Sequence, residues 1–391
     1  MEEMLLRFLV IITVVFFIPK VVYHIRKIPY PITEVVLGIV LGILVPSYFF
    51  ADDVIKILAS LGIITIFVCG GMEINIGFIK RSKKMILQNA ILQIVLLAGV
   101  ATFLIYVFTF TTQVGLILAL ALIVPSAGYV FSFVRQTGVH PKERNWVEGI
   151  VICSEILGIL LLLIFLNMDD VPMIALSLIV ITLLVTLLPK LLDFLYTKVF
   201  KKMIGLEFAF IFVVALISAY ITEAIGVHFI IGAFIAGIVA KRFIDDIRKD
   251  GHITNVRHMN ITEGFSFFSQ VFAPFYFFSV GLMLSLNILT VEAAAIAIAF
   301  VVGATAVRFT LVLKHRRWKM KETYNRSFNI AVMTMPTIVF TFVIADILHK
   351  SFGISDTMFG ALLLYGIMTA IVPLILMKKA KGNDGDIMGE K

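Results

Sequence analysis

Charged residues are scarce in this chain of 391 residues: they make up 15% of it, whereas hydrophobic residues make up 60%. Soluble domains carry about 25% charged residues, so the composition excludes a soluble multi-domain enzyme. Cysteine is scarce too. Cys69 and Cys153 lie in separate apolar runs, which excludes a disulfide framework, and the Cys/His spacing of zinc sites is absent.

The apolar runs are continuous and about 20 residues long, which is typical of membrane-spanning helices. Strands of a membrane β-barrel would instead alternate apolar and polar residues. The sequence therefore predicts an all-α, polytopic membrane protein with about 13 transmembrane helices. The predicted spans are 4–22, 32–48, 54–76, 85–109, 113–136, 146–166, 171–195, 205–222, 227–241, 263–285, 288–313, 326–348 and 357–377.

The basic residues test this count of spans. Of the 33 lysines and arginines, 29 fall in segments that follow odd-numbered spans, whereas segments after even-numbered spans carry few. Cytoplasmic loops are enriched in such residues, which places the amino terminus outside and the carboxyl terminus in the cytoplasm of a multi-pass cell-membrane protein. The basic loop Lys314–Lys321 is interpreted as an anchor against anionic lipid and not as a nucleic-acid site.

The chain is predicted to hold one transmembrane domain, residues 1–377, followed by a short disordered cytoplasmic tail, residues 378–391. No loop is long enough for a further folded domain. No nucleophile–base pair or phosphate-binding loop is present, so neither an enzyme nor a cofactor is expected.

Ionisable side chains inside membrane spans are costly, so each is a candidate functional residue. Glu155 lies about ten residues from the cytoplasmic end of the sixth span, which is about 15 Å deep at 1.5 Å per residue. Because burial disfavours the charged form, this carboxyl group can hold a proton under one condition and a cation under another. A protonated structural Glu155 is the alternative. Ser154 offers a neighbouring hydroxyl oxygen, although a helical serine often bonds its own backbone.

Three further charges are more ambiguous. Arg308 in the eleventh span is a fixed countercharge, since arginine stays protonated, but it is close enough to Lys314 to extend to the cytoplasmic surface instead. Glu148 and Glu73 lie nearer the cytoplasmic ends of their spans and are accessory carboxylates or simply solvated.

Proline interrupts two of the spans. The interruptions are marked by Pro125, Ser126 and Gly128 in the fifth span and by Thr334, Pro336 and Thr337 in the twelfth. Proline removes a backbone hydrogen bond, and neighbouring small or hydroxyl residues favour unwound segments. The two spans are seven apart and so run in opposite directions. Two inverted repeats would have this arrangement, with discontinuous helices crossing at mid-membrane and spans four to six matching eleven to thirteen.

The sequence resembles the family of monovalent cation:proton antiporters, which comprises the bacterial and archaeal sodium/proton and potassium/proton exchangers. The resemblance rests on the order and spacing of four glycine-containing stretches, Leu37–Gly42, Leu61–Asn75, Ile230–Arg242 and Ala273–Leu286. It implies that the family's paired site residues fall on Ser154-Glu155, where the family has an acid or amide followed by aspartate, and that Arg308 is the family's basic residue. It also implies core helices at about 54–166 and 263–377, scaffold helices elsewhere, and a homodimer.

The leading hypothesis is a secondary antiporter that exchanges protons for Na⁺ or K⁺ by alternating access. Glu155 would carry either the proton or the monovalent cation, Ser154, Ser126 and backbone oxygens would complete the cation's shell, and Arg308 would balance charge at the crossing. Because Glu155 alone titrates there, exchange is predicted to be electroneutral. The alternatives are a passive cation channel or non-transporting sensor on the same scaffold, and a Na⁺-coupled organic-anion symporter.

Overall fold

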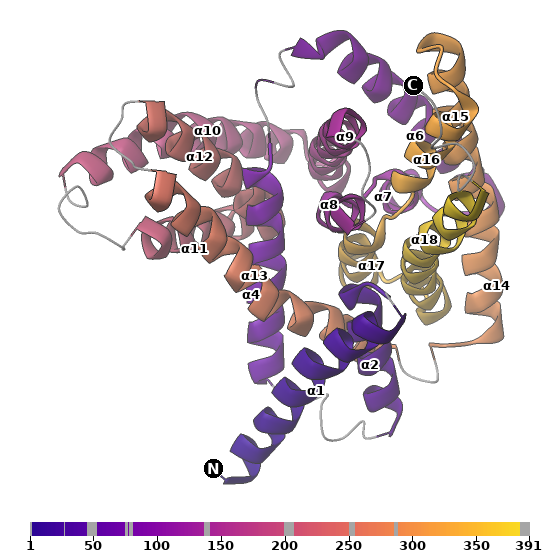
Figure 1. Cartoon of the computed structure of the whole chain (residues 1–391), viewed down its shortest axis with the longest axis horizontal. Coiled ribbons are helices and arrows are strands. Elements are labelled where there is room, and N and C mark those ends of the chain that lie inside the picture. Colours follow the sequence, from indigo (N-terminus) through magenta and orange to yellow (C-terminus); the bar gives the residue numbers. More distant parts are fainter. Residues whose placement is uncertain are drawn as a thin grey trace. The chain divides into compact units, whose positions relative to one another are not determined.

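The computed structural model describes residues 2–26, 28–44, 53–74, 77, 81–136, 141–198, 207–249, 255–284 and 288–383. Within these ranges every regular element is a helix (Figure 1), which confirms the predicted all-α class. Each predicted span coincides with one helix or with consecutive helical segments. Backbone contacts divide the chain into two compact units: unit 1 comprises Met1–Ile74 and Asn167–Leu284, and unit 2 comprises Asn75–Leu166 and Ser285–Lys391.

The lengths of the helices suit a membrane. In the described part of the chain, ten helices are long and apolar enough to cross one, and two shorter apolar helices accompany them. The ninth predicted span corresponds to α12 (Phe229–Lys249), which is not among these ten. Six of the last nine residues of α12 are charged, so only its first part is apolar.

Unit 1 is built from α12 and six further helices in its described residues. These are α1 (Glu2–Arg26), α2 (Tyr30–Leu44), α4 (Asp53–Met72), α10 (Val171–Lys198), α11 (Glu207–Ala224) and α13 (Asn255–Met283). Helix α4 packs along both α12 and α13, and α2 packs along α13.

Glycines allow the helices of unit 1 to approach closely. A methyl group on Gly38 of α2 would overlap the carbonyl oxygen of Phe278, and one on Gly281 of α13 would overlap that of Val35. Gly71 and Gly237 have the same relationship across α4 and α12. The helix backbones are in contact at these glycines, so there is no room for a Cβ atom. Such contacts through small residues are common where membrane helices pack. The glycine-containing stretches noted in the sequence are therefore packing surfaces.

Unit 2 contains two series of helices with the same plan. The first is α6 (Lys83–Phe108), α7 (Thr112–Ile123), α8 (Ala127–Gln136) and α9 (Pro141–Leu166). The second is α14 (Val291–Phe300), the π-helical segment η2 (Val301–Thr305), α15 (Ala306–Lys319), α16 (Tyr324–Met333), α17 (Ile338–Phe352) and α18 (Asp356–Asn383). Each series runs from an uninterrupted span through a broken one to another uninterrupted span, as the repeat hypothesis predicted.

The predicted tail overlaps the end of a helix, and the predicted core overlaps both units. Helix α18 continues to Asn383, so its last turns extend beyond residue 377, where the tail was predicted to begin, and 384–391 lie outside the described residues. Residues 54–74 and 263–284, predicted as core, fall in unit 1. The units are defined by contacts, whereas core and scaffold are defined by movement, so the core assignment stays a prediction.

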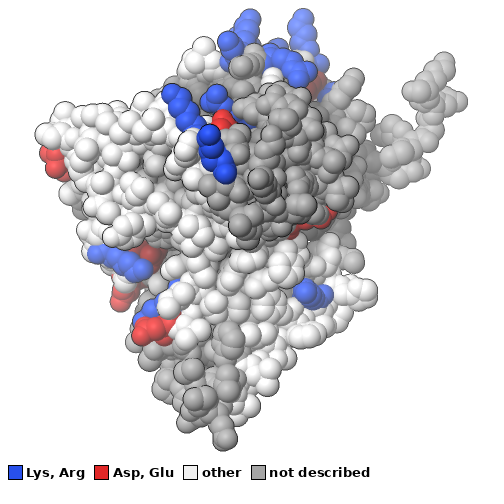
Figure 2. Space-filling model, turned by 90° about the vertical axis from the view of Figure 1, so that its left-hand side faces the viewer, with Lys and Arg blue, Asp and Glu red and all other residues white. Residues whose placement is uncertain are grey.

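Apolar side chains dominate the described surface. Helices α6 and α10 expose large hydrophobic residues along much of their length, including Ile91, Val95 and Phe103 on α6 and Ile179 and Leu187 on α10. On the face shown in Figure 2, most of the described surface is uncharged and the charged side chains form a few separate patches. An aqueous protein rarely exposes so much apolar area, whereas a lipid-facing helix requires it.

Candidate functional site

The two broken spans cross in unit 2. The unwound segment between α7 and α8 contains Pro125, and that between α16 and α17 contains Pro336. The backbone N–H of Ser126 donates to the carbonyl of Pro336 over 2.9 Å, which joins the two interruptions directly. The crossing predicted from the prolines is therefore present within this unit.

Arg308 satisfies the backbone of both interruptions. One terminal nitrogen donates to the carbonyls of Leu122 and Ile123, at 3.4 and 2.7 Å, at the end of α7. The other donates to the carbonyls of Thr334, at 3.0 Å, and Met335, at the end of α16. The side chain is 5% exposed and does not extend to the surface, which removes one of the two interpretations open from the sequence.

This arrangement balances charge as well as hydrogen bonds. The carboxyl-terminal end of a helix carries partial negative charge, and two such ends meet at Arg308. The π-helical turn η2 precedes Arg308 on the same helix. Such turns are rare and often occur at functional sites.

Two hydroxyl groups complete the hydrogen bonding at the end of α7. The phenol of Tyr365 donates to the Leu122 carbonyl over 2.6 Å, and Thr341 Oγ1 donates to the Ala121 carbonyl over 2.7 Å. Backbone groups freed by a break inside a membrane span must find such partners. Side-chain donors thus satisfy the backbone carbonyls at the end of α7.

Glu155 lies beside this crossing on α9. Its side chain is 5% exposed, as is that of Ser154. Gly158, almost one turn further along, packs so closely that a Cβ atom there would lie 2.8 Å from the side chain of Val124 and 3.1 Å from that of Phe340. Val124 belongs to the first interruption and Phe340 to α17, so this part of α9 runs directly against the crossed helices.

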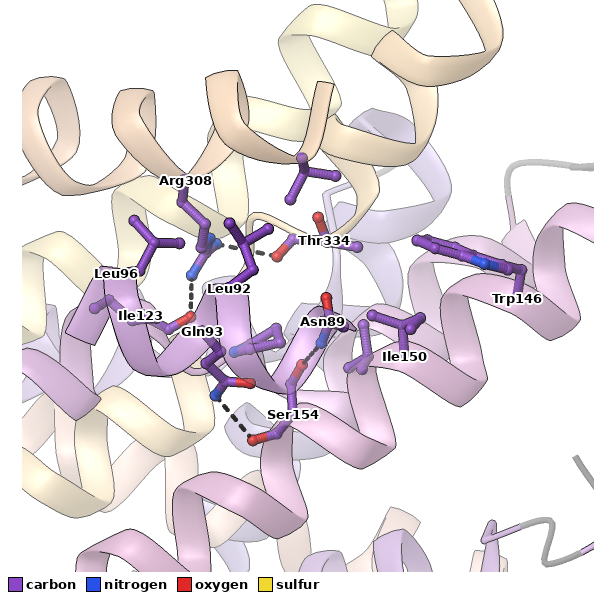
Figure 3. A pocket seen from close by; sticks show the side chains of 13 residues that line it. Asn89, Leu92, Gln93, Leu96, Ile123, Trp146, Ile150, Ser154, Arg308 and Thr334 are labelled. Carbon is purple, nitrogen blue, oxygen red and sulfur yellow. Dashed lines mark hydrogen bonds between the residues drawn. The ribbon is translucent and has the colours of Figure 1, made fainter. Parts of the chain in front are cut away.

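A small pocket connects α9 with the crossing (Figure 3). It is partly open and has about 40 Å³ of accessible space, and its lining includes Ser154, Arg308, Thr334 and Pro125 but not Glu155. Four of the residues predicted for the site therefore share one cavity. Its volume suits a small ion with a water or two, since one water occupies about 30 Å³ of liquid.

The other predicted crossing residues have different surroundings. Ser126 Oγ is buried and has no hydrogen-bond partner among the described residues. Thr337 Oγ1 lies 3.2 Å from Thr369 Oγ1 and 2.8 Å from Thr341 Oγ1, within hydrogen-bonding distance of both hydroxyls. Gly128 is exposed on α8. Of these residues, Ser126 offers the free oxygen.

The two accessory carboxylates differ in position. Glu148 accepts a hydrogen bond from Arg144, one turn earlier on α9, over 2.9 Å, and this pair is partly exposed. Glu73 follows the end of α4 and belongs to unit 1. Glu148 is thus already paired with a basic residue.

One residue of the basic loop 314–321 departs from its predicted role. Arg316 is 1% exposed, forms two hydrogen bonds with Glu322 at 2.7 and 2.6 Å, and stacks over the Trp146 ring, 3.8 Å from its centroid. Trp146 lines the pocket, so Arg316 stabilises its wall instead of contacting lipid.

Two carboxamide residues of the pocket were not predicted from the sequence. Asn89 and Gln93 of α6 both line the pocket and both bond to Ser154 (Figure 3). Neither side chain carries a charge, so neither is among the ionisable residues of the membrane spans. The available signal was a group of three carboxamides, Gln88, Asn89 and Gln93, in the first half of a predicted membrane span.

Comparison with known proteins identifies similar chains. The family described as "Sodium/hydrogen exchanger, transmembrane" matches residues 10–378. A curated protein of Methanocaldococcus jannaschii, "Probable Na(+)/H(+) antiporter 3", is 22% identical over 391 residues, covering 97% of each chain. The solved structure of the sodium proton antiporter MjNhaP1 from the same organism, at pH 8, superimposes with a TM-score of 0.72 at 15% identity and covers 100% of both chains.

Proposed function

The chain belongs to the sodium/hydrogen exchanger family, and from this premise we propose that it exchanges one proton for one Na⁺ or K⁺ by alternating access. The observation that supports this most strongly is the buried carboxyl group of Glu155 beside a crossing of two broken helices. Membership of the family also makes the protein a multi-pass membrane transporter and not an enzyme.

Glu155 is the proposed carrier. In an apolar environment a carboxylate needs a partner for its charge, and either a bound proton or a bound cation supplies it. One negative charge balances one positive charge, so the two ions exclude each other. This competition couples the uptake of one to the release of the other.

Oxygen atoms of α9 and of the crossing provide the proposed cation shell. Ser154 and Ser126 carry buried hydroxyls, and unwound backbone segments expose carbonyl oxygens, as in other transporters built on broken helices. Arg308 donates hydrogen bonds to the carbonyls at both helix ends, so it stabilises the crossing while the ion is exchanged. It is a proposed countercharge and not a proton carrier.

The pairing of Glu148 with Arg144 supports the one-for-one ratio, because Glu148 then does not act as a second ion carrier on α9. We further propose that a core within residues 54–166 and 263–377 moves against the remaining scaffold helices, in a homodimer in the cell membrane. In this arrangement the amino terminus lies outside and the carboxyl terminus in the cytoplasm, as the basic residues indicate.

The pocket argues against one alternative. Its volume of about 40 Å³ is far below the roughly 300–1,000 Å³ of typical organic-ligand sites, which disfavours an organic-anion symporter. A passive channel or a sensor would share the fold, so only transport assays distinguish them from an exchanger.

Purified protein in liposomes with a trapped pH-sensitive dye tests the proposal. Na⁺ or K⁺ added outside should drive protons across the membrane, whereas choline should not. A channel would instead carry cation current without proton counterflow, and a symporter would take up labelled organic anion only with Na⁺. The absence of cation-driven proton movement with Li⁺, Na⁺ and K⁺ alike would contradict exchange.

A further inference from the structure

Two carboxamide side chains connect α6 to the site. Asn89 Nδ2 donates to the hydroxyl oxygen of Ser154 over 2.9 Å, and Gln93 Nε2 donates to the backbone carbonyl of the same residue over 3.1 Å. Figure 3 shows both side chains reaching from one helix to Ser154. Asn89 therefore fixes the orientation of the Ser154 hydroxyl, and Gln93 fixes the position of its backbone.

The oxygen of Gln93 is the unusual atom. Gln93 is 5% exposed, lines the pocket, and its Oε1 has no hydrogen-bond partner among the described residues. A buried polar atom normally has a partner, because leaving one unpaired is costly. A tether between helices requires only the nitrogen of this side chain, so tethering leaves the oxygen unexplained.

The charges around the pocket allow a cation next to this oxygen. Arg308 also lines the pocket, but both of its terminal nitrogens point to carbonyls at the ends of α7 and α16. The negative ends of these helices offset its charge. The cavity of about 40 Å³ admits an alkali cation with little of its water, and carbonyl-type oxygens replace such water in selective ion sites.

We propose that Gln93 Oε1 is a direct ligand of the transported alkali cation in this pocket, together with Ser154 Oγ as oriented by Asn89. This inference rests on the proposed exchange function and names a further residue that determines cation affinity and selectivity. An amide does not titrate, so Gln93 binds the cation only, and Glu155, the next residue of α9 after Ser154, keeps its proposed role of carrying either ion.

Substitutions at Gln93 separate a ligand from a tether. Gln93→Met removes both the oxygen and the nitrogen of the side chain. It should raise the KM for Na⁺ about tenfold, which corresponds to a loss of about 1.4 kcal/mol in binding free energy. It should also change the ratio of the KM values for Li⁺ and Na⁺. Gln93→Glu keeps oxygen ligands but loses the amide donor, so it should bind Na⁺ at least as tightly as wild type. A tether would make both variants equally defective.

Gln113 of α7 provides a matched control. Its Nε2 also connects a helix to α9, by donating to the carbonyls of Phe165 and Leu166 over 2.9 and 3.2 Å. Unlike Gln93, Gln113 does not line the pocket. Gln113→Met should change thermal stability without changing the KM for Na⁺ or the Li⁺/Na⁺ ratio.

Binding is measured as well as transport, through the rise in melting temperature that NaCl, compared with choline chloride, produces in the detergent-purified protein. Loss of this rise in Gln93→Met but not in Gln93→Glu supports the proposal.

A wild-type KM and ion ratio in Gln93→Met, or loss of the Na⁺ response in Gln93→Glu, overturns the proposal. A water bound in the pocket would then be the simpler occupant. If Gln93→Met does not fold, the Gln93→Glu result decides. If wild type responds to Na⁺ but does not exchange it, the proposed function fails and the binding site stands.

Discussion

Glu155→Gln is expected to abolish cation-driven proton movement while leaving the protein folded. Glutamine has nearly the same size and hydrogen-bonding capacity, but it cannot bind a proton in exchange for a cation. Since Glu155 is buried on α9 beside the crossed helices, no mobile surface group takes over its role. Proton flux in liposomes should fall to the level of protein-free vesicles, with Na⁺, Li⁺ or K⁺.

Glu292→Gln is the matched control. Glu292 is an exposed acidic residue in the first turn of α14, in the same unit. The same change of charge there should leave the exchange rate unaltered. Wild-type rates in Glu155→Gln, with a folded protein by size-exclusion chromatography, would remove this residue from the mechanism.

Arg308→Leu is expected to destabilise the protein severely. It leaves the carbonyls of Ile123, Thr334 and Met335 without the side chain that bonds them, and a buried carbonyl without a donor costs about 1–3 kcal/mol. Arg308→Lys keeps the charge, but one ammonium group cannot span two helix ends as a planar guanidinium does. It should fold with a lower melting temperature and exchange more slowly.

Lys350→Leu is the control for removing a basic residue from unit 2. Lys350 forms an exposed pair with Asp346 on α17, and such surface pairs contribute about 0–1 kcal/mol. Its melting temperature should stay close to that of wild type. An Arg308→Leu protein with wild-type stability would show that the crossing does not depend on this side chain.

The fold was predictable because the membrane restricts what a sequence can do. Each span must be an apolar helix, and the basic segments must alternate with poorly charged ones, so hydropathy and charge together fix the number of spans. Pro125 and Pro336 marked both interruptions only together with their small or hydroxyl-bearing neighbours, because other prolines of the chain lie inside continuous helices, namely Pro19, Pro189, Pro274 and Pro373.

The partners that complete the site were less predictable. Arg308 bonds to Ile123 across 185 residues and Tyr365 to Leu122 across 243, and no local pattern encodes such pairs. Asn89 and Gln93 carry no charge, so nothing in the sequence marked them as costly, and their common target on α9 became apparent only in three dimensions. Nothing in the sequence distinguishes Arg316 from the other basic residues of its loop, yet its side chain is buried over the ring of Trp146.

The voltage dependence of exchange tests the central claim, that one carboxylate carries either one proton or one cation. In sealed liposomes with Na⁺ as substrate, a membrane potential is imposed with potassium and valinomycin while proton flux is followed. Glu155 alone titrating at the site predicts the same initial rate at inside-negative, zero and inside-positive potential. A clear acceleration by either sign of potential would contradict the account, because it requires a second charge-carrying group, with Glu148 and Glu73 the first to be examined.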